Sequence, residues 1–140
     1  MPYLIEPQKN DGKISSLKEE LNIPDNAVVL GRHGGFDTWN LPFVNDVIKQ
    51  VVRERADIYL LFMNTPNFIK HPQVIFIDGT HEDKRIAQFL STCDAMIHSR
   101  WEGETFGLAC AEFLINKKPI ITWAESRERN HIFMADKSVI

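Results

Sequence analysis

Five short apolar runs divide the chain, and segments with a helical pattern separate most of them. The runs are largely continuous in Val, Ile, Leu and Phe and do not alternate with polar residues, which is typical of parallel strands covered on both faces. They predict strands at Ala27–Gly31, Ile58–Met63, Val74–Ile77, Ala95–Ser99 and Pro119–Trp123.

Four other segments carry helix signals. Ser16 and Glu19 have the spacing of a capping box, and Thr80 is an expected N-cap ahead of an acidic first turn. The signals predict helices at Ser16–Leu21, Phe43–Arg55, Glu82–Cys93 and Phe106–Asn116. Strands that alternate with helices in this way predict an α/β class, a doubly wound (Rossmann-like) parallel sheet with right-handed crossovers. In the second helix, one apolar face is expected to contain Phe43, Val47, Ile48, Val51 and Val52.

Length and composition fit one domain, residues 1–140. The chain is 44% hydrophobic and 25% charged, as is ordinary for a soluble protein, and its formal charge of −3 leaves no footprint for nucleic acid. Because it has no apolar stretch of membrane-span length and no signal-peptide core, we expect a cytoplasmic location. Cys93 and Cys110 lie in apolar helical segments and are expected to be buried thiols. The histidines show no metal-ligand spacing, so no metal site is expected.

The strongest functional signal is the segment from Glu104 to Glu112. It is apolar from Phe106 to Ile115 apart from Gly107 and Glu112, which predicts a buried core helix. A buried carboxylate is costly unless something binds it. The segment therefore predicts a helix whose first turn and one acidic side chain face a polar ligand.

Ordinary structural explanations stand beside this interpretation. Glu112 would also be explained by a buried ion pair with Arg32 or Lys118. Glu104 would also be explained as a solvated loop residue, and Glu102 is equally available. His98, near a strand end, is more typical of a satisfied core histidine than of a base.

The same residues resemble a known family. Ser99–Glu112 (SRWEGETFGLACAE) is similar to the two-glutamate motif of retaining GT-B glycosyltransferases of the group 1, glycogen-synthase-like type. The likeness runs from about Ser16 to about Thr122. It includes Val28–Gly35 as first strand and phosphate loop, Leu61–Thr65 and Val74–Ile77 as middle strands, and Ala95–Ser99 and Pro119–Thr122 as the last two.

The resemblance implies the C-terminal, donor-binding half of a GT-B fold. Residues 1–14 would be an interdomain strand or linker, with Met1–Ile5 leading in from an acceptor domain that this chain lacks. The implied reaction moves a sugar, of hexosyl type, from a nucleoside diphosphate sugar to an acceptor hydroxyl with retention of configuration. No cofactor or metal is implied beyond that donor substrate, and membrane association of a full-length parent is compatible with the family.

The resemblance also implies the site. Glu104 would face the sugar hydroxyls and Arg32 the departing diphosphate, both as catalytic residues, while Glu112 would accept from the ribose. The remaining donor-binding residues would be Gly34, Gly35, Phe106, Gly107 and Leu108. Loops at Asn64–Thr65 and Asp78 either contact the nucleotide, with the base recognised through backbone near Phe76–Ile77, or are ordinary turns.

Two departures from the family pattern leave an alternative open. The family usually carries a Lys several residues after the Arg, but Phe36–Asn40 contains none, so either the Gly34 and Gly35 amides replace that cation or donor binding is weaker. The usual Gly-rich turn is replaced by Ala124–Arg127, to which we assign no role. The alternative function is a catalytically silent nucleotide-binding α/β module. A receiver-like module is disfavoured, because its aspartate and lysine positions hold Arg32, Asp78 and Trp123.

Overall fold

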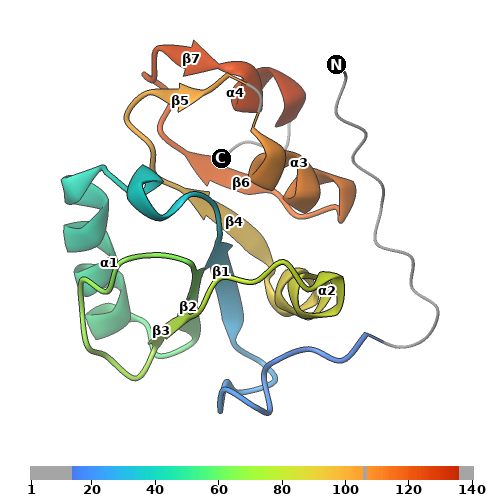
Figure 1. Ribbon diagram of the computed structural model, residues 1–140. Coiled ribbons are helices and arrows are strands. Elements are labelled where there is room, and N and C mark those ends of the chain that lie inside the picture. The colour runs from blue at the N-terminus through green and yellow to red at the C-terminus, as the bar shows by residue number, and fades with distance from the viewer. Residues whose placement is uncertain (1–13, 106, 136–140) are drawn as a thin grey trace.

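The computed structural model describes residues 14–105 and 107–135. Its centre is a five-stranded, wholly parallel sheet in the order β3-β2-β1-β4-β6, which confirms the predicted fold class (Figure 1). Each strand ends within one residue of its prediction. The strands are β1 (Val28–Arg32), β2 (Ile58–Met63), β3 (Val74–Ile77), β4 (Ala95–His98) and β6 (Ile120–Thr122).

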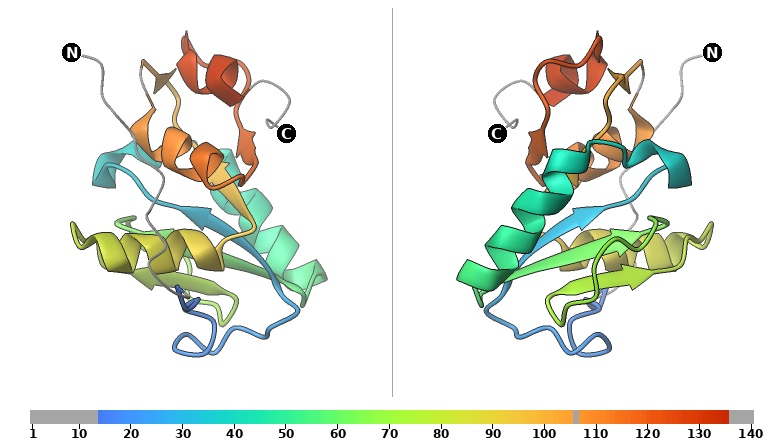
Figure 2. Two further views of the ribbon diagram at one scale, coloured as in Figure 1. Left: turned by 90° about the vertical axis from the view of Figure 1, so that its right-hand side faces the viewer. Right: turned by 90° about the vertical axis from the view of Figure 1, so that its left-hand side faces the viewer.

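Helices cover both faces of the sheet (Figure 2). One face packs against α1 (Pro42–Glu54), whose Ile48 and Val52 join Leu60 and Phe62 of β2 in an apolar cluster. The other face packs against α2 (Asp83–Thr92) and α3 (Leu108–Ile115). Adjacent strand residues point to opposite faces, so neighbours such as Phe62 and Met63 enter different clusters.

β1 is the central strand of the sheet, and later strands are added on both sides of it. The chain runs from β1 to β2 and β3 on one side, then crosses back to place β4 and β6 on the other. The carboxyl ends of β1 and β4 therefore lie side by side where the strand order reverses. Open α/β sheets bind their ligands at such a point.

The sequence patterns did not predict four small elements. A two-stranded parallel sheet joins β5 (Gly103–Glu104) to β7 (Glu128–Arg129), and α4 (Asn130–Ala135) follows directly. A single 3-10 turn, η1 (Phe36–Thr38), lies between β1 and α1. Two-residue strands carry no periodicity, so only their long-range pairing defines them.

One predicted helix is wrong. Ser16–Leu21 forms hydrogen-bonded turns, in which the Ser16 hydroxyl accepts from Lys18 N–H and not from the Glu19 position of a capping box. The segment stops at Asn22, whose φ of 56° is left-handed. A short segment without a long apolar face has little to stabilise it as a helix.

The other helices confirm their predictions, with local differences. Thr80 is not an N-cap: its hydroxyl accepts from Glu82 N–H just before α2 begins. On α1, Phe43 and Val47 are about half exposed instead of buried. They border an apolar pocket of about 260 Å³ beside β6. The prediction for Met1–Ile5 lies outside the described residues, and no helix of the described part is long and apolar enough to cross a membrane.

Candidate functional site

A cleft of about 400 Å³ opens at the carboxyl ends of β1 and β4. Its walls come from the turn after β1, the segment that joins β4 to α3, and the first turns of α3. A larger hollow of about 1000 Å³ beside residues 67–72 offers one lysine and one histidine instead of a converging set of charges. Seven of the predicted site residues line the smaller cleft: Arg32, Gly34, Gly35, Glu104, Gly107, Leu108 and Glu112. Phe106, the eighth, lies outside the described residues.

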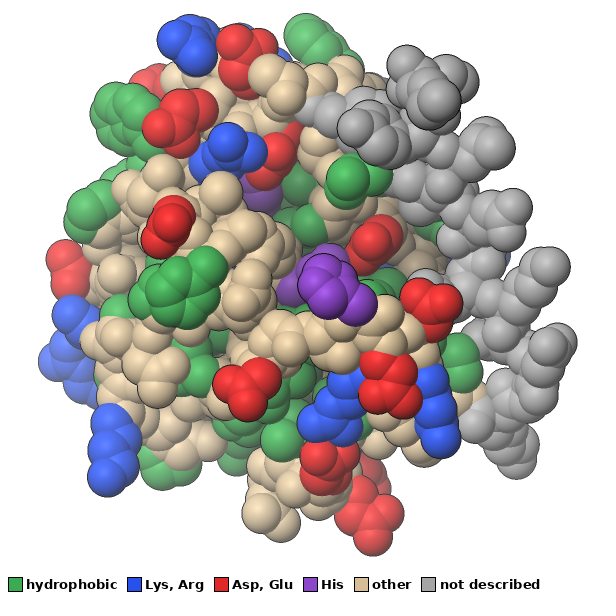
Figure 3. Space-filling model, viewed as in Figure 1, with side chains coloured by type: hydrophobic (Ala, Val, Ile, Leu, Met, Phe, Trp, Pro, Cys, Tyr) green, Lys and Arg blue, Asp and Glu red, His purple; other side chains and the backbone are tan. Residues whose placement is uncertain are grey.

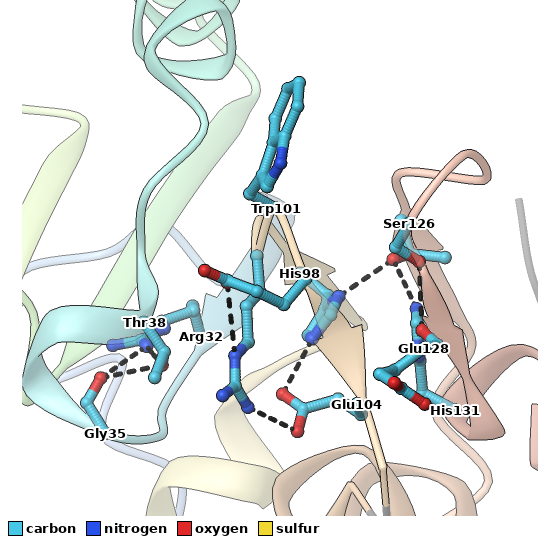
Figure 4. A network of polar contacts seen from close by, with 12 residues as sticks. Arg32, Gly35, Thr38, His98, Trp101, Glu104, Ser126, Glu128 and His131 are labelled. Atoms are coloured by element: carbon cyan, nitrogen blue, oxygen red, sulfur yellow. Dashed lines mark hydrogen bonds and ion pairs between the residues drawn. The ribbon is translucent and has the colours of Figure 1, made fainter.

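Polar side chains converge on this end of the molecule. Figure 3 shows histidine side chains near the middle of one face with acidic side chains beside them. In the close view of Figure 4, Glu104 points to His98, while Arg32 points to Gly35 and Thr38 on the other side of the cleft. The sequence motif is thus assembled at the switch point of the sheet.

Glu104 is held by two side chains and is not a solvated loop residue. Its Oε1 lies 3.0 Å from His98 Nε2, and its Oε2 accepts from Arg100 Nη1 at 2.9 Å. Burial raises the pKa of the carboxyl, but the hydrogen bond from His98 and the charge of Arg100 outweigh burial and hold the pKa below its ordinary value. The carboxylate is therefore ionised and fixed in direction.

The backbone of Glu104 is fixed as well, by the β5–β7 pair. Gly103 has a φ of 74°, and a Cβ there would overlap the carbonyl oxygen of Glu128 and lie 2.6 Å from Ser126 Oγ. Only glycine allows this approach. Glu128 N–H donates to Glu102 O at 2.8 Å, and Ser126 donates to Glu128 O. The segment after β6, to which the sequence assigned no role, therefore positions the first glutamate of the motif.

Arg32 ends β1 and is only 4% exposed. Its Nη1 donates to Asn64 O and Thr65 Oγ1, and its Nη2 donates to Gly35 O and Thr38 Oγ1. Burial lowers the pKa of the guanidinium to about 10, while the charge of Glu104 opposes that lowering, so the group stays positive at neutral pH. Arg32 brings charge to the cleft, but it also ties two loops together. Its burial excludes a surface ion pair as the reason for its presence.

Side-chain hydrogen bonds hold the glycine turn after β1 through its carbonyl groups. Gly35 O accepts from Thr38 Oγ1 as well as from Arg32, and Gly34 O accepts from Asn64 Nδ2 at 2.9 Å. Thr38 and Asn64 thereby fix the turn to β1 and β2. The Thr38 contact is local, whereas the Asn64 contact depends on loops that meet across two strands and is not visible in the sequence pattern.

α3 begins at the cleft, but it is not buried all round as predicted. Gly107 is its N-cap with a φ of 80°, and a Cβ at that position would lie 3.2 Å from Met134 Cε and 3.3 Å from Glu104 Cβ. Leu108 is 46% exposed, whereas Cys110, Ala111 and Phe113 are buried. One face of the helix therefore faces the cleft. Its N-terminal amides and dipole favour an anion there.

Glu112 has neither of the two predicted ion-pair partners. Its Oε2 lies 2.8 Å from His33 Nε2, and the side chain is 31% exposed, so it is half-buried and not a core carboxylate. The two atoms touch without the alignment of a hydrogen bond, and both remain unsatisfied. A ligand hydroxyl that reached Glu112 would supply the missing donor.

Arg100 and His98 are the cleft residues that sequence reasoning missed as functional candidates. The prediction that His98 is satisfied is confirmed, since both of its ring nitrogens have partners, but it also touches Glu104. Arg100 precedes Glu104 by four residues in a loop, where that spacing has no fixed meaning. Its position after a strand end was the available signal.

A second pocket of about 280 Å³ adjoins the same edge of the sheet. Asn64, Thr65 and Asp78 line it together with Phe36, Phe76 and Gly79. Because Asn64 and Thr65 also hold Arg32, the two pockets share a wall. Among residues 14–105 and 107–135, no three His, Cys, Asp or Glu side chains gather as metal ligands.

Comparison with known proteins gives the fold. No protein-family model matches the sequence, and no curated protein matches it. Among solved structures, WaaG, a glycosyltransferase involved in lipopolysaccharide biosynthesis, superposes with a TM-score of 0.63 at 15% identity, covering 88% of this chain and 36% of that one. Anabaena Alr3699/HepE in complex with UDP-glucose gives 0.60 at 17%, covering 79% and 33%. TarM gives 0.59 at 14%, covering 91% and 30%.

The chain thus spans about a third of the length of the solved structures that it resembles. At identities this low, the TM-scores of 0.59 to 0.63 show a common fold. The five-stranded parallel sheet, its helices on both faces and these superpositions give one conclusion: the chain has the Rossmann-like fold of one domain of a GT-B glycosyltransferase.

Proposed function

We propose that the chain is the donor-binding half of a glycosyltransferase that transfers a sugar from a nucleoside diphosphate sugar to an acceptor hydroxyl. The supporting observation is the cleft itself. A fixed, ionised Glu104, the buried cation Arg32 and the first turn of α3 meet there, and Glu112 stands on the same wall. HepE, of similar fold, was solved with UDP-glucose.

Each group has a distinct part in the proposal. The diphosphate lies at the N-terminus of α3, near Gly107 and Leu108, and faces Arg32. Glu104 accepts from hydroxyls of the sugar, and the unsatisfied Glu112 accepts from the ribose. The nucleotide base enters the adjoining pocket near Phe76.

Arg100 can supply the positive charge that a lysine after Arg32 usually supplies in the family. Its Nη1 binds Glu104, while its buried Nε has no hydrogen-bond partner and lies 3.8 Å from Glu102 Oε2. Charge on a departing diphosphate needs preorganised cations. With the donors of Arg32 turned to loop oxygens, Arg100 is the second cation that can face this charge.

One observation favours the alternative function, a catalytically silent nucleotide-binding module. Four hydrogen bonds commit Arg32 to Asn64, Thr65, Gly35 and Thr38, so its donors serve the fold first. A silent module would bind a nucleoside diphosphate and show no turnover in the full-length parent. A glycosyltransferase would show sugar transfer, and Arg100→Gln would slow it.

Further details belong to the same proposal. Retention of configuration, a hexosyl donor and catalysis without a metal follow from the resemblance in Ser99–Glu112. The acceptor would be held by a separate N-terminal domain. The protein would work in the cytoplasm, and association of the full-length parent with a membrane is compatible with this proposal.

Calorimetric titration with UDP, GDP and ADP tests the donor site. One diphosphate should bind, and Glu112→Gln should weaken it by about 1–3 kcal/mol, the scale of a lost hydrogen bond to a charged group. Glu19→Gln is the matched control, because Glu19 is an exposed glutamate before β1, at the opposite edge of the sheet. Equal binding by the wild type and Glu112→Gln would refute the assigned role of Glu112, and no binding of any diphosphate to the folded chain would count against the proposed function.

A further inference from the structure

A chain of hydrogen bonds runs from α4 to the cleft through buried groups. His131 Nε2 lies 3.2 Å from Thr122 Oγ1, which lies 2.8 Å from His98 Nδ1. His98 Nε2 then lies 3.0 Å from Glu104 Oε1. His131 is fully buried and His98 is 7% exposed, so water does not compete for these contacts. Figure 4 shows His131 and Glu104 on two sides of His98.

The proton positions along this chain follow from its two ends. At the cleft end, Glu104 is ionised and can only accept, so His98 Nε2 must carry a proton. At the α4 end, His131 Nδ1 is buried without a hydrogen-bond partner. A buried N–H without an acceptor is rarer than a bare acceptor, so the single proton of a neutral His131 belongs on Nε2.

Only one arrangement then satisfies the middle of the chain. His131 Nε2–H donates to the Thr122 oxygen, the Thr122 hydroxyl donates to His98 Nδ1, and His98 Nε2–H donates to Glu104. If His98 carried a proton on Nδ1, Thr122 would have to donate to His131 instead. The proton of His131 would then sit on the unpartnered Nδ1. The two rings also lie 4.5 Å apart, which disfavours charge on both.

We propose that His98 is a positioning residue for Glu104, and that Thr122 and His131 hold the His98 ring in the orientation that donates to this carboxylate. With Arg100 on Oε2 and His98 on Oε1, both oxygens are fixed, and each keeps a lone pair for a ligand. The proton arrangement stands on the structure alone. Its use, aiming Glu104 at sugar hydroxyls, rests on the proposed function.

The tautomers can be measured on the whole chain without ligand. Long-range ¹H–¹⁵N NMR of the histidine rings at pH 7.5 should show a proton on Nε2 and a bare Nδ1 for both His98 and His131. A proton on Nδ1 of His98 would overturn the arrangement. This experiment needs no variant, so it decides the question even if substitutions unfold the protein.

Variants of Thr122 then test the positioning role. Thr122→Val removes the hydroxyl that holds His98 Nδ1. His98 should keep its Nε2 proton, because Glu104 still accepts from it, but the ring should lose its fixed orientation. Affinity for UDP-glucose should fall by about three- to tenfold, the value of one neutral hydrogen bond, while affinity for UDP is unchanged. Thr122→Ser keeps a hydroxyl beside His98 Nδ1 and should restore the affinity.

Thr92→Val is the matched control. The Thr92 hydroxyl also has one donor and one acceptor, Leu17 N–H and Gln88 O, but it lies in α2 away from the cleft. It should leave the ratio of UDP-glucose to UDP affinity unchanged. A folded Thr122→Val protein with wild-type affinity for UDP-glucose would overturn the positioning role. Failure of the wild type to bind UDP, GDP or ADP would count against the proposed function, while the tautomer measurement would still decide the proton arrangement.

Discussion

Gly103→Ala should destabilise the protein by about 2–4 kcal/mol. An alanine at a φ of 74° costs about 1–2 kcal/mol for the left-handed conformation alone. The added Cβ would also overlap the Glu128 carbonyl oxygen, so β5 and β7 must separate and lose the bond from Glu128 N–H to Glu102 O. A lost hydrogen bond of this kind adds about 1 kcal/mol, and displacement of Ser126 adds to it.

Urea unfolding followed by circular dichroism measures this change, and titration with UDP-glucose measures its effect on the cleft. Because Glu104 follows Gly103, binding of the sugar nucleotide should weaken while the rest of the sheet stays folded. Gly35→Ala is the control for stability: Gly35 has a φ of −60° and a ψ of 141°, and a Cβ there would meet Thr38 Cγ2 at 3.2 Å. It should change stability by no more than about 0.5 kcal/mol. Equal stability of the two variants would refute the reasoning.

Two further predictions concern titratable groups. Burial lowers the pKa of His131 to about 4, so between pH 6.5 and 4 the unfolded chain binds a proton that the folded chain rejects. The free energy of unfolding should therefore fall by up to about 3 kcal/mol as pH drops through this window. Urea unfolding at several pH values measures this, and a His131→Leu protein whose stability depended on pH as steeply as that of the wild type would contradict it. Burial also raises the pKa of Cys110 to about 12, helped by the charge of Glu104, and raises that of Cys93 further. Neither thiol should react with a disulfide reagent at pH 8 until denaturant is added, and rapid labelling of the native protein would show the burial to be wrong.

The sheet was predictable because its signal is local. Each strand of the main sheet is a largely continuous apolar run, as expected for strands that are buried on both faces. The short elements lacked any such signal. Gly103–Glu104 pairs with Glu128–Arg129 only because the chain returns to it after β6. The false helix at Ser16–Leu21 shows the opposite error, since a local capping pattern was present in a segment too short to be stable as a helix, even though Leu17 is buried.

The candidate site was predictable as a set of positions but not as a set of contacts. Strand ends and the two-glutamate pattern brought seven residues to one cleft. The partner of Glu112 was not foreseen, because His33 reaches it from the turn after β1. Nor did composition separate Glu104 from Glu102. The structure separates them, because the Glu104 side chain is 20% exposed and held by His98, while that of Glu102 is 49% exposed.

The contacts of Arg32 change how the motif should be understood. A motif arginine suggests a phosphate ligand, yet this guanidinium is buried against four loop oxygens, at the wall between the two pockets. Its charge still acts over a few ångströms in a partly buried site, where screening is weak. Its hydrogen bonds, however, serve to hold the glycine turn against β2. Under the proposed function, direct contact with an anion would then come from the amides at the start of α3 and from Arg100, a residue that no motif marked. The positive charge of the cleft is thus divided between Arg32, which is buried and holds the fold together, and Arg100, which is partly exposed to the cleft.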